Sequence, residues 1–167
     1  SGATYTFNVI PSGQGVVSVD VSAGVCADAA GNTNTASNTL SRTFDSIGPT
    51  VTLSSSAPQT VNGPITVEVE LSESSTNFTS GDVTATNATV TNLSGSGTAY
   101  SFTLTPQAKL GKAQGVFSAM VNAGVFTDAA GNTNTASNTI LRAYNTDIQI
   151  TVVTPNGGEK WRIGKRA

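Results

Sequence analysis

The 167-residue sequence has no histidine, one cysteine and few charges, with only 11% of its residues acidic or basic. The missing histidine removes the side chain most often used for general acid–base catalysis near neutral pH. A single cysteine excludes a disulfide within the chain. No apolar run reaches the length of a membrane-spanning helix, so we expect no insertion into a membrane. These absences favour a noncatalytic domain.

The acidic residues are too scattered to suggest a catalytic pair. The closest two, Glu68 and Glu70, share the water-facing side of a predicted strand, where they favour solubility. We therefore expect the protein not to be an enzyme. The ten carboxylates are Asp20, Asp28, Asp45, Glu68, Glu70, Glu73, Asp82, Asp128, Asp147 and Glu159.

Basic residues gather near the C-terminus, where Lys160, Arg162, Lys165 and Arg166 are half of the eight in the chain. Nucleic-acid binding requires a broader basic face with several aromatic residues, and only Trp161 lies here. The pattern predicts no nucleic-acid partner. Two interpretations stay open for this tail, namely the ordinary start of a further domain and a head-to-tail contact with the acidic body of another subunit.

The most informative feature that is present is a twelve-residue string that occurs twice without change. It occupies Asp28 to Thr39 and again Asp128 to Thr139. A spacing of one hundred residues exceeds solenoid periods and suits one small all-β domain per copy, so the sequence predicts a tandem repeat. Further correspondences pair Gln14 with Gln114, Arg42 with Arg142 and, upstream of five extra residues around Ala108 to Lys112, Tyr5, Phe7 and Pro11 with Tyr100, Phe102 and Pro106.

The register of the repeat divides the chain into three segments. Nothing in residues 1–47 corresponds to the stretch from Gly48 to Leu93. We therefore expect residues 1–47 to be the C-terminal half of a domain and residues 48–145 to be a complete one. Residues 146–167 are expected to be either the first strand of a following domain or a docking tail, in which Ile148 to Val153 adds a strand to the next subunit.

Alternation of apolar and polar residues predicts β-strands throughout. In Pro64 to Leu71 the apolar positions fall on one face and the polar positions on the other, as in a half-buried antiparallel strand. Cys26 corresponds to Phe126, and we expect it to be a small buried residue. Seven short strands in one repeat predict an all-β Greek-key sandwich. The other predicted strands are Thr4 to Ile10, Val16 to Val21, Asp82 to Leu93, Ala99 to Thr105, Val116 to Val121 and Ser137 to Tyr144.

Several short motifs carry a resemblance to a known family. They include Leu71-Ser-Glu73, Gly81-Asp-Val-Thr84 and Ala123-Gly-Val-Phe-Thr-Asp-Ala-Ala-Gly-Asn132. Residues 49–144 resemble the bacterial immunoglobulin-like (Ig-like) repeats of giant surface adhesins and biofilm proteins, which implies an Ig-like β-sandwich at the cell surface. Separately, Pro155 to Trp161 resembles the start of a fibronectin-like module found on secreted proteins.

The repeated string has two interpretations. As turn chemistry, Asp28 and Asp128 accept backbone N–H groups two residues on, and the glycines of the string supply positive φ angles. As a calcium site, Asp128 meets the linker residue Asp45 and Glu73 at one pole of an Ig-like sandwich, and Asn132 or backbone carbonyls complete the ligands. Calcium between domains stiffens the rod in the resembled adhesins. Asp82 is a further candidate, although a capping role at a strand start explains it more simply.

Together these features predict a noncatalytic, extracellular repeat of a bacterial adhesin or filament. It would act as a rigid spacer or assembly module, with neighbouring Ig-like domains as partners, or with identical subunits joined head to tail by β-strand addition. The alternative is a carbohydrate-binding or host-binding module, which requires an exposed aromatic platform. Tyr5, Tyr100 and Tyr144 are instead expected near strand cores or ends.

Overall fold

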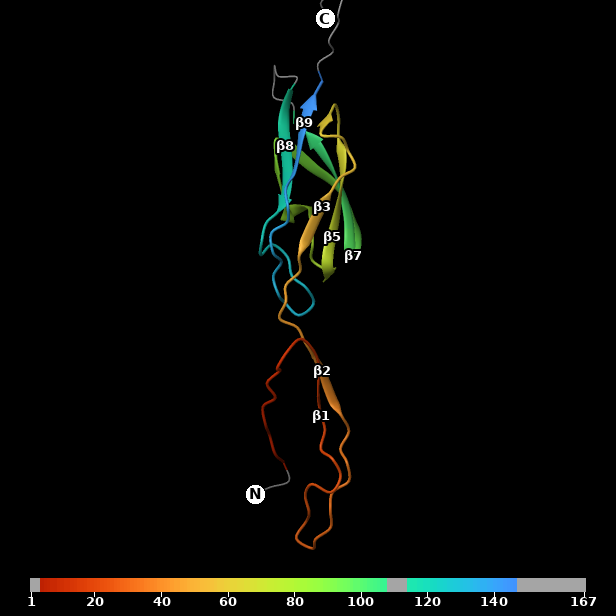
Figure 1. Ribbon diagram of the computed structural model, residues 1–167, viewed down its shortest axis with the longest axis vertical. Coiled ribbons are helices and arrows are strands. Elements are labelled where there is room, and N and C mark those ends of the chain that lie inside the picture. The colour runs from red at the N-terminus through yellow and green to blue at the C-terminus, as the bar shows by residue number, and fades with distance from the viewer. Residues whose placement is uncertain (1–3, 108–113, 147–167) are drawn as a thin grey trace, which may run out of the picture.

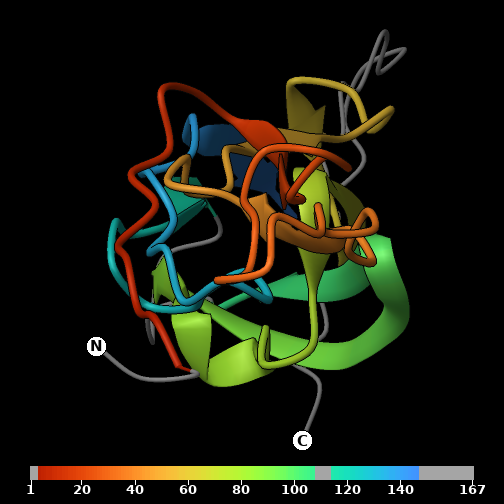
Figure 2. The same cartoon turned by 90° about the horizontal axis from the view of Figure 1, so that it is seen from below.

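The computed structural model describes residues 4–107 and 114–146, which form two units arranged end to end (Figure 1). Viewed along the long axis, the two units overlap in projection (Figure 2). Among the described residues, no helix is long and apolar enough to cross a membrane.

The first unit holds β1 (Gly15–Val19) and β2 (Leu40–Phe44). The second holds β3 (Val51–Ser54), β4 (Thr60–Val61), β5 (Ile65–Ser75), the short 3-10 helix η1 (Ser80–Asp82), β6 (Val83–Thr86), β7 (Ala88–Pro106), β8 (Gln114–Val121) and β9 (Ile140–Asn145).

The second unit is a sandwich of two sheets, one ordered β3-β5-β7 and the other β4-β9-β8-β6. The chain changes sheets between β3 and β4, because β3 pairs antiparallel with β5 whereas β4 runs parallel to β9. This crossing, together with the Greek-key order of the remaining strands, is the Ig-like arrangement. The predicted all-β, Ig-like sandwich is confirmed.

The core between the two sheets follows the predicted alternation. Along β5, the side chains of Ile65, Val67, Val69 and Leu71 are buried, while Glu68 and its polar neighbours are exposed. At one end of the core, the ring of Phe78 packs edge-on against Tyr100 and Phe126, with centroids 5.1 and 5.2 Å apart. Such edge-to-face contacts add to the burial of the rings.

The predicted strand from Asp82 to Leu93 is wrong as a single element. The backbone breaks at Asn87, which has a φ of 54° and whose side-chain amide donates to the carbonyl of Val116. An asparagine tolerates this left-handed conformation because its short polar side chain bonds locally. Asp82 belongs to η1, where it accepts from the backbone N–H and the hydroxyl of Thr79. Asp82 thus has a capping role, as expected, but it caps the short helix η1 directly before β6 and not the start of a strand.

The first unit departs from the sequence predictions in three places. Residues 4–14 form no strand, although Thr4 to Ile10 was predicted as one. Cys26 is exposed rather than buried, and Tyr5 is 82% exposed, whereas its counterpart Tyr100 is buried. The cause is shared, because among the described residues no second sheet packs on the β1–β2 pair.

Two predicted features lie outside the described residues. These are the insertion around Ala108 to Lys112 and the C-terminal segment from residue 147, with its candidate docking strand Ile148 to Val153 and its basic residues. The division of the chain into residues 1–47, 48–145 and 146–167 stays a prediction.

Candidate metal centre at the junction of the two units

The loop that follows Phe126 is closed by its own aspartate. Asp128 Oδ1 accepts the backbone N–H groups of Gly131 (2.7 Å) and Asn132 (2.9 Å), and Oδ2 accepts the Asn132 side-chain amide (2.8 Å). Gly131 has a φ of 94°, a conformation that glycine adopts without a steric penalty. The residue types of the string therefore determine the shape of the loop.

The identical string in the first unit folds in the same way. Asp28 Oδ1 accepts the backbone N–H of Asn32 (2.9 Å), and Oδ2 accepts its side-chain amide (2.9 Å). A bridge between Ala27 and Thr33 matches the bridge between Thr127 and Thr133. Turn chemistry therefore accounts for the loop conformation in both copies. Turn chemistry does not account for the position of the second loop beside other carboxylates.

Three carboxylates converge at the junction of the units. Asp45 comes from the linker between β2 and β3, Glu73 from β5, and Asp128 from the loop after β8, and each offers an oxygen within 4.8 Å of the others. Of the described residues, these three form the one such group. Asp128 is buried, and the other two are partly exposed. The structure thus brings together the three acidic residues that the sequence singled out.

The linker that carries Asp45 is held from both units. From the first unit, the Gln14 side-chain amide donates to Asp45 Oδ1 (2.7 Å). From the second unit, the Asn132 amide donates to the Asp45 carbonyl oxygen (3.3 Å), and the Thr135 N–H donates to the Pro49 carbonyl oxygen (2.9 Å). Sequence reasoning missed Gln14, although its repetition as Gln114 marked the position.

Gly48 is a second residue of the linker that sequence reasoning missed. A Cβ atom at this position would collide with the carbonyl oxygen of Thr133. The close approach of these two backbones therefore requires glycine. The same contact lays the linker directly against the loop that carries Asp128.

The electrostatics of the cluster are unbalanced. Desolvation, together with the negative charges of Asp45 and Asp128, raises the pKa of Glu73 above its ordinary value of 4.5. Desolvation acts in the same direction on Asp128, but hydrogen bonds from Asn132, Gly131 and Ala130 outweigh it and lower the pKa of that carboxyl. The basic side chains of the described residues, Arg42 and Arg142, donate to backbone carbonyls away from the cluster.

The donor set suits a hard divalent cation. Carboxylate oxygens and water are the ligands that Ca²⁺ prefers, at six to eight positions. Asp45 Oδ1 and Asp128 Oδ1 already accept two N–H groups each, which leaves Asp45 Oδ2, both Glu73 oxygens and part of Asp128 Oδ2. Asn132 differs from the prediction. Its amide nitrogen faces Asp128 and Asp45, so in this arrangement it positions carboxylates and offers no oxygen to an ion.

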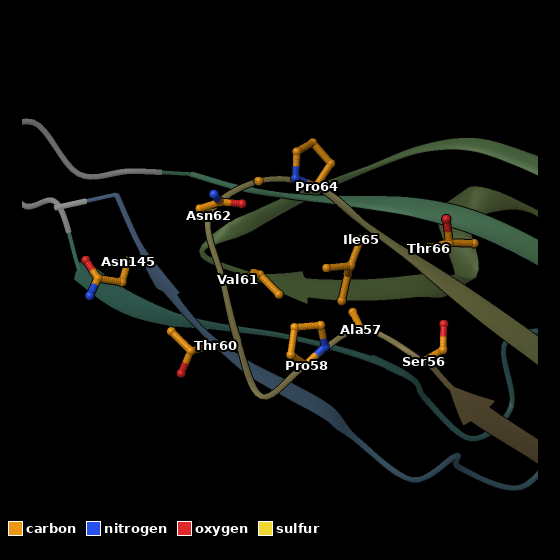
Figure 3. Close-up of a pocket in the computed structure, with 11 residues that line it drawn as sticks. Ser56, Ala57, Pro58, Thr60, Val61, Asn62, Pro64, Ile65, Thr66 and Asn145 are labelled. Carbon is orange, nitrogen blue, oxygen red and sulfur yellow. The ribbon is translucent and has the colours of Figure 1, made fainter. Parts of the chain in front are cut away.

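A surface hollow lies beside β4 and the end of β9, away from these carboxylates, and Figure 3 shows the residues that line it. Among the described residues, its lining contains no acidic or basic side chain and is made of Ser56, Ala57, Pro58, Thr60, Val61, Asn62, Gly63, Pro64, Ile65, Thr66 and Asn145. A hollow without a titratable group provides no acid, base or charged nucleophile for catalysis.

Aromatic exposure bears on the alternative of a carbohydrate-binding surface. Tyr100 and Tyr144 are buried, as predicted. Tyr5 and Phe7 are 82% and 68% exposed. However, their counterparts Tyr100 and Phe102 lie in the core of the second unit, so these rings belong to an open core face and not to a separate platform on a closed domain.

Comparison with known proteins identifies the second unit. A family model described as a bacterial Ig-like domain matches residues 45–144. The match covers β3 to β9 together with Asp45, so all three carboxylates lie inside it. Neither a curated protein nor a solved structure matches the chain.

Proposed function

The chain belongs to the family of bacterial Ig-like domains, and on that basis we propose that it is a rigid, noncatalytic spacer in an extracellular surface adhesin or filament. A noncatalytic structural module agrees with the family and with the absence of histidine from the sequence. The extracellular setting is supported by the sequence resemblance to surface repeats.

The convergence of Asp45, Glu73 and Asp128 at the junction carries the proposal. Three negative charges within 4.8 Å repel one another unless a cation lies between them. Because Asp45 belongs to the linker and the other two belong to the second unit, an ion held by all three would tie the linker to the sandwich. Ca²⁺ would supply this tie, while Asn132 and Gln14 orient the carboxylates.

Isothermal titration calorimetry tests this proposal. The full chain is first treated with chelator and is then titrated with CaCl₂. We expect one bound ion per chain and a rise in the unfolding temperature with calcium, because a ligand that binds only the folded state stabilises it. Glu73→Gln keeps the shape of the side chain and removes one negative charge, so it should weaken binding at least tenfold.

Glu70→Gln is the matched control, since Glu70 lies on the same strand with its side chain exposed and outside the cluster. It should leave calcium binding unchanged. Binding that is equally weak or absent in the wild type and in Glu73→Gln would remove calcium from the proposal and leave a spacer held by hydrogen bonds alone.

Neighbouring Ig-like domains are the proposed partners, joined end to end as the two units are here. Assembly of identical subunits head to tail by β-strand addition is a separate prediction. Sedimentation velocity over a concentration series tests it, since growth into large species supports assembly and a single monomeric species at all concentrations rejects it.

A further inference from the structure

Asn62 differs from the other asparagines of the described residues in the residue that follows it. Glycine follows Asn62, whereas valine, threonine, phenylalanine, alanine or leucine follows each of the others. A side chain at the following position hinders access to the backbone nitrogen between the two residues, and glycine has no side chain. The nitrogen of Gly63 can therefore approach the side-chain carbonyl carbon of Asn62.

The loop around Asn62 is open to water. Asn62 lies between β4 and β5 with its side chain exposed, and a Cβ atom added to Gly63 would meet nothing within 4 Å. Figure 3 shows Asn62 on this loop, between Val61 and Pro64 along the chain. Pro64 has no N–H group with which to close a turn. Among the described residues, no hydrogen bond holds the Asn62 side chain or the Gly63 N–H.

Other asparagines of the second unit are held in place. The side-chain amides of Asn77, Asn134 and Asn138 each bond through both the oxygen and the nitrogen. Asn138, for example, accepts the N–H of Leu53 (2.8 Å) and donates to the Leu53 carbonyl oxygen (2.9 Å). Turning such a side chain toward the next backbone nitrogen would break these bonds, and buried groups would lose their partners. Asn62 is under no such restraint.

From these observations we propose that Asn62 is a site of spontaneous covalent modification. The Gly63 nitrogen gives its proton to water or hydroxide and attacks Asn62 Cγ. A bond forms between the two atoms, and the side-chain nitrogen takes a proton from water and leaves as ammonia, which gives a succinimide ring. Water then opens the ring at Cγ to give aspartate, or at the backbone carbonyl carbon to give isoaspartate. The net change consumes a water molecule, releases ammonia and needs no oxidant or cofactor.

The two products differ in their effect on the neighbouring strand. Both place a negative charge beside a hollow whose described lining has no charged side chain. Isoaspartate also adds a methylene group to the backbone directly after β4. That strand pairs Thr60 with Ala143 and Val61 with Tyr144, and the Ala143 N–H donates to the Gln59 carbonyl oxygen (2.9 Å). Because this pairing is short, the isoaspartate form should loosen β4 from β9.

Peptide mapping by mass spectrometry tests the proposal on the full chain, incubated at 37 °C and sampled over time. At pH 9, Asn62 should gain the mass of an amide converted to an acid at least tenfold faster than Asn77, Asn134 or Asn138. Conversion should be slower at pH 7, because the attacking nitrogen must lose its proton. The sequence Asn156-Gly157 lies outside the described residues, and mapping by fragmentation reads it separately.

Gly63→Ala is the matched variant. Its methyl group hinders the attack but meets no neighbouring atom, so the fold is kept while conversion at Asn62 should slow at least tenfold. Conversion at Asn62 no faster than at the three held asparagines, or unchanged by Gly63→Ala, would overturn the proposal. So would conversion that begins only after the chain is unfolded in denaturant, because the folded loop would then be closed to the reaction.

Amide hydrogen exchange tests the effect on β4. The isoaspartate form, separated by its added charge, should exchange the Ala143 amide at least tenfold faster than the unmodified chain. Asn62→Asp adds the same charge without lengthening the backbone, so it should leave this exchange unchanged. Equal exchange in the isoaspartate form and in Asn62→Asp would overturn the loosening of β4. Calcium plays no part in this reaction, so this proposal and the calcium proposal fail separately.

Discussion

At the scale of single residues, identical side chains have different energetic weight in the two units. Asn134 is 3% exposed and its side chain makes four hydrogen bonds. The amide oxygen accepts the backbone N–H groups of Val125 and Phe126, and the amide nitrogen donates to the carbonyl oxygens of Asn122 and Thr135. Asn34 makes the equivalent four bonds in a partly exposed setting. Water replaces lost partners at the exposed site, whereas groups left unpaired in the buried site bear the full cost of desolvation.

The two asparagines therefore form a matched pair of substitutions. We expect Asn134→Ala to lower the free energy of unfolding of the second unit by about 2 kcal/mol or more, since several buried backbone groups lose their partners. Asn34→Ala should lower the free energy of unfolding of the first unit by no more than about 0.5 kcal/mol, because water replaces the lost partners there. Denaturant unfolding followed by circular dichroism measures both. Equal losses would show that burial does not set the weight of this residue.

Gly48 provides a steric test of the junction. Gly48→Ala places a methyl group against the carbonyl oxygen of Thr133, so the linker and the loop must separate. We expect a loss of about 1 to 3 kcal/mol in unfolding free energy, as for other overpacked sites. Gly63→Ala is the control, because a Cβ atom there meets nothing within 4 Å. The unfolding temperatures of the two variants are compared by thermal unfolding. A Gly48→Ala protein as stable as the Gly63→Ala control would contradict the observed packing.

The raised pKa of Glu73 predicts a pH dependence of calcium binding. Its folded pKa lies above 4.5, so without an ion the charged side chain destabilises the fold at neutral pH, and protonation relieves this as the pH falls through the folded pKa. An ion between the carboxylates favours the charged form. Calcium binding should therefore release protons at acidic pH, where Glu73 is partly protonated, and the release should shrink as the pH rises above the raised pKa of Glu73. Calorimetry in buffers of different ionisation enthalpy detects the release, and Glu73→Gln should abolish it.

At the scale of elements, the strand register follows the sequence closely where both sheets are present. The alternation along β5 predicted its buried face because a one-residue shift would turn Val67 and Val69 toward water. The same reasoning failed for Thr4 to Ile10, which has a similar pattern but no partner strand among the described residues. Alternation thus predicts which face is apolar, and pairing decides whether a strand forms.

The candidate site could be predicted only in part for a related reason. The sequence pointed to Asp45, Glu73 and Asp128 because the topology of an Ig-like sandwich places the linker and two loops at one pole. It could not give the orientation of the Asn132 amide, which depends on how that side chain pairs with Asp128 and with the Asp45 carbonyl. Nor did it point to Gly48, whose role depends on a backbone contact across 85 residues of sequence.

At the scale of the whole molecule, the relation between the two units rests on a short linker. Its contacts reach both sides, through Gln14 in the first unit and Asn132 in the second. Repulsion among the three carboxylates acts against these contacts when no cation is present. The stiffness of the junction should therefore depend on calcium, in addition to the rise in unfolding temperature expected from binding to the folded state.

Distance measurements between spin labels test this directly. Cys26 provides a native attachment point in the first unit, and Thr66→Cys, on the exposed face of β5, provides one in the second. We expect a narrow distance distribution with calcium and a broader one with chelator, because the ion joins the Asp45 linker to Glu73 and Asp128. In a Glu73→Gln background the distribution should be broad in both conditions. Equal widths with and without calcium in the wild type would mean that the hydrogen bonds of Gln14 and Asn132 hold the units in line by themselves, and the ion would then have no mechanical role.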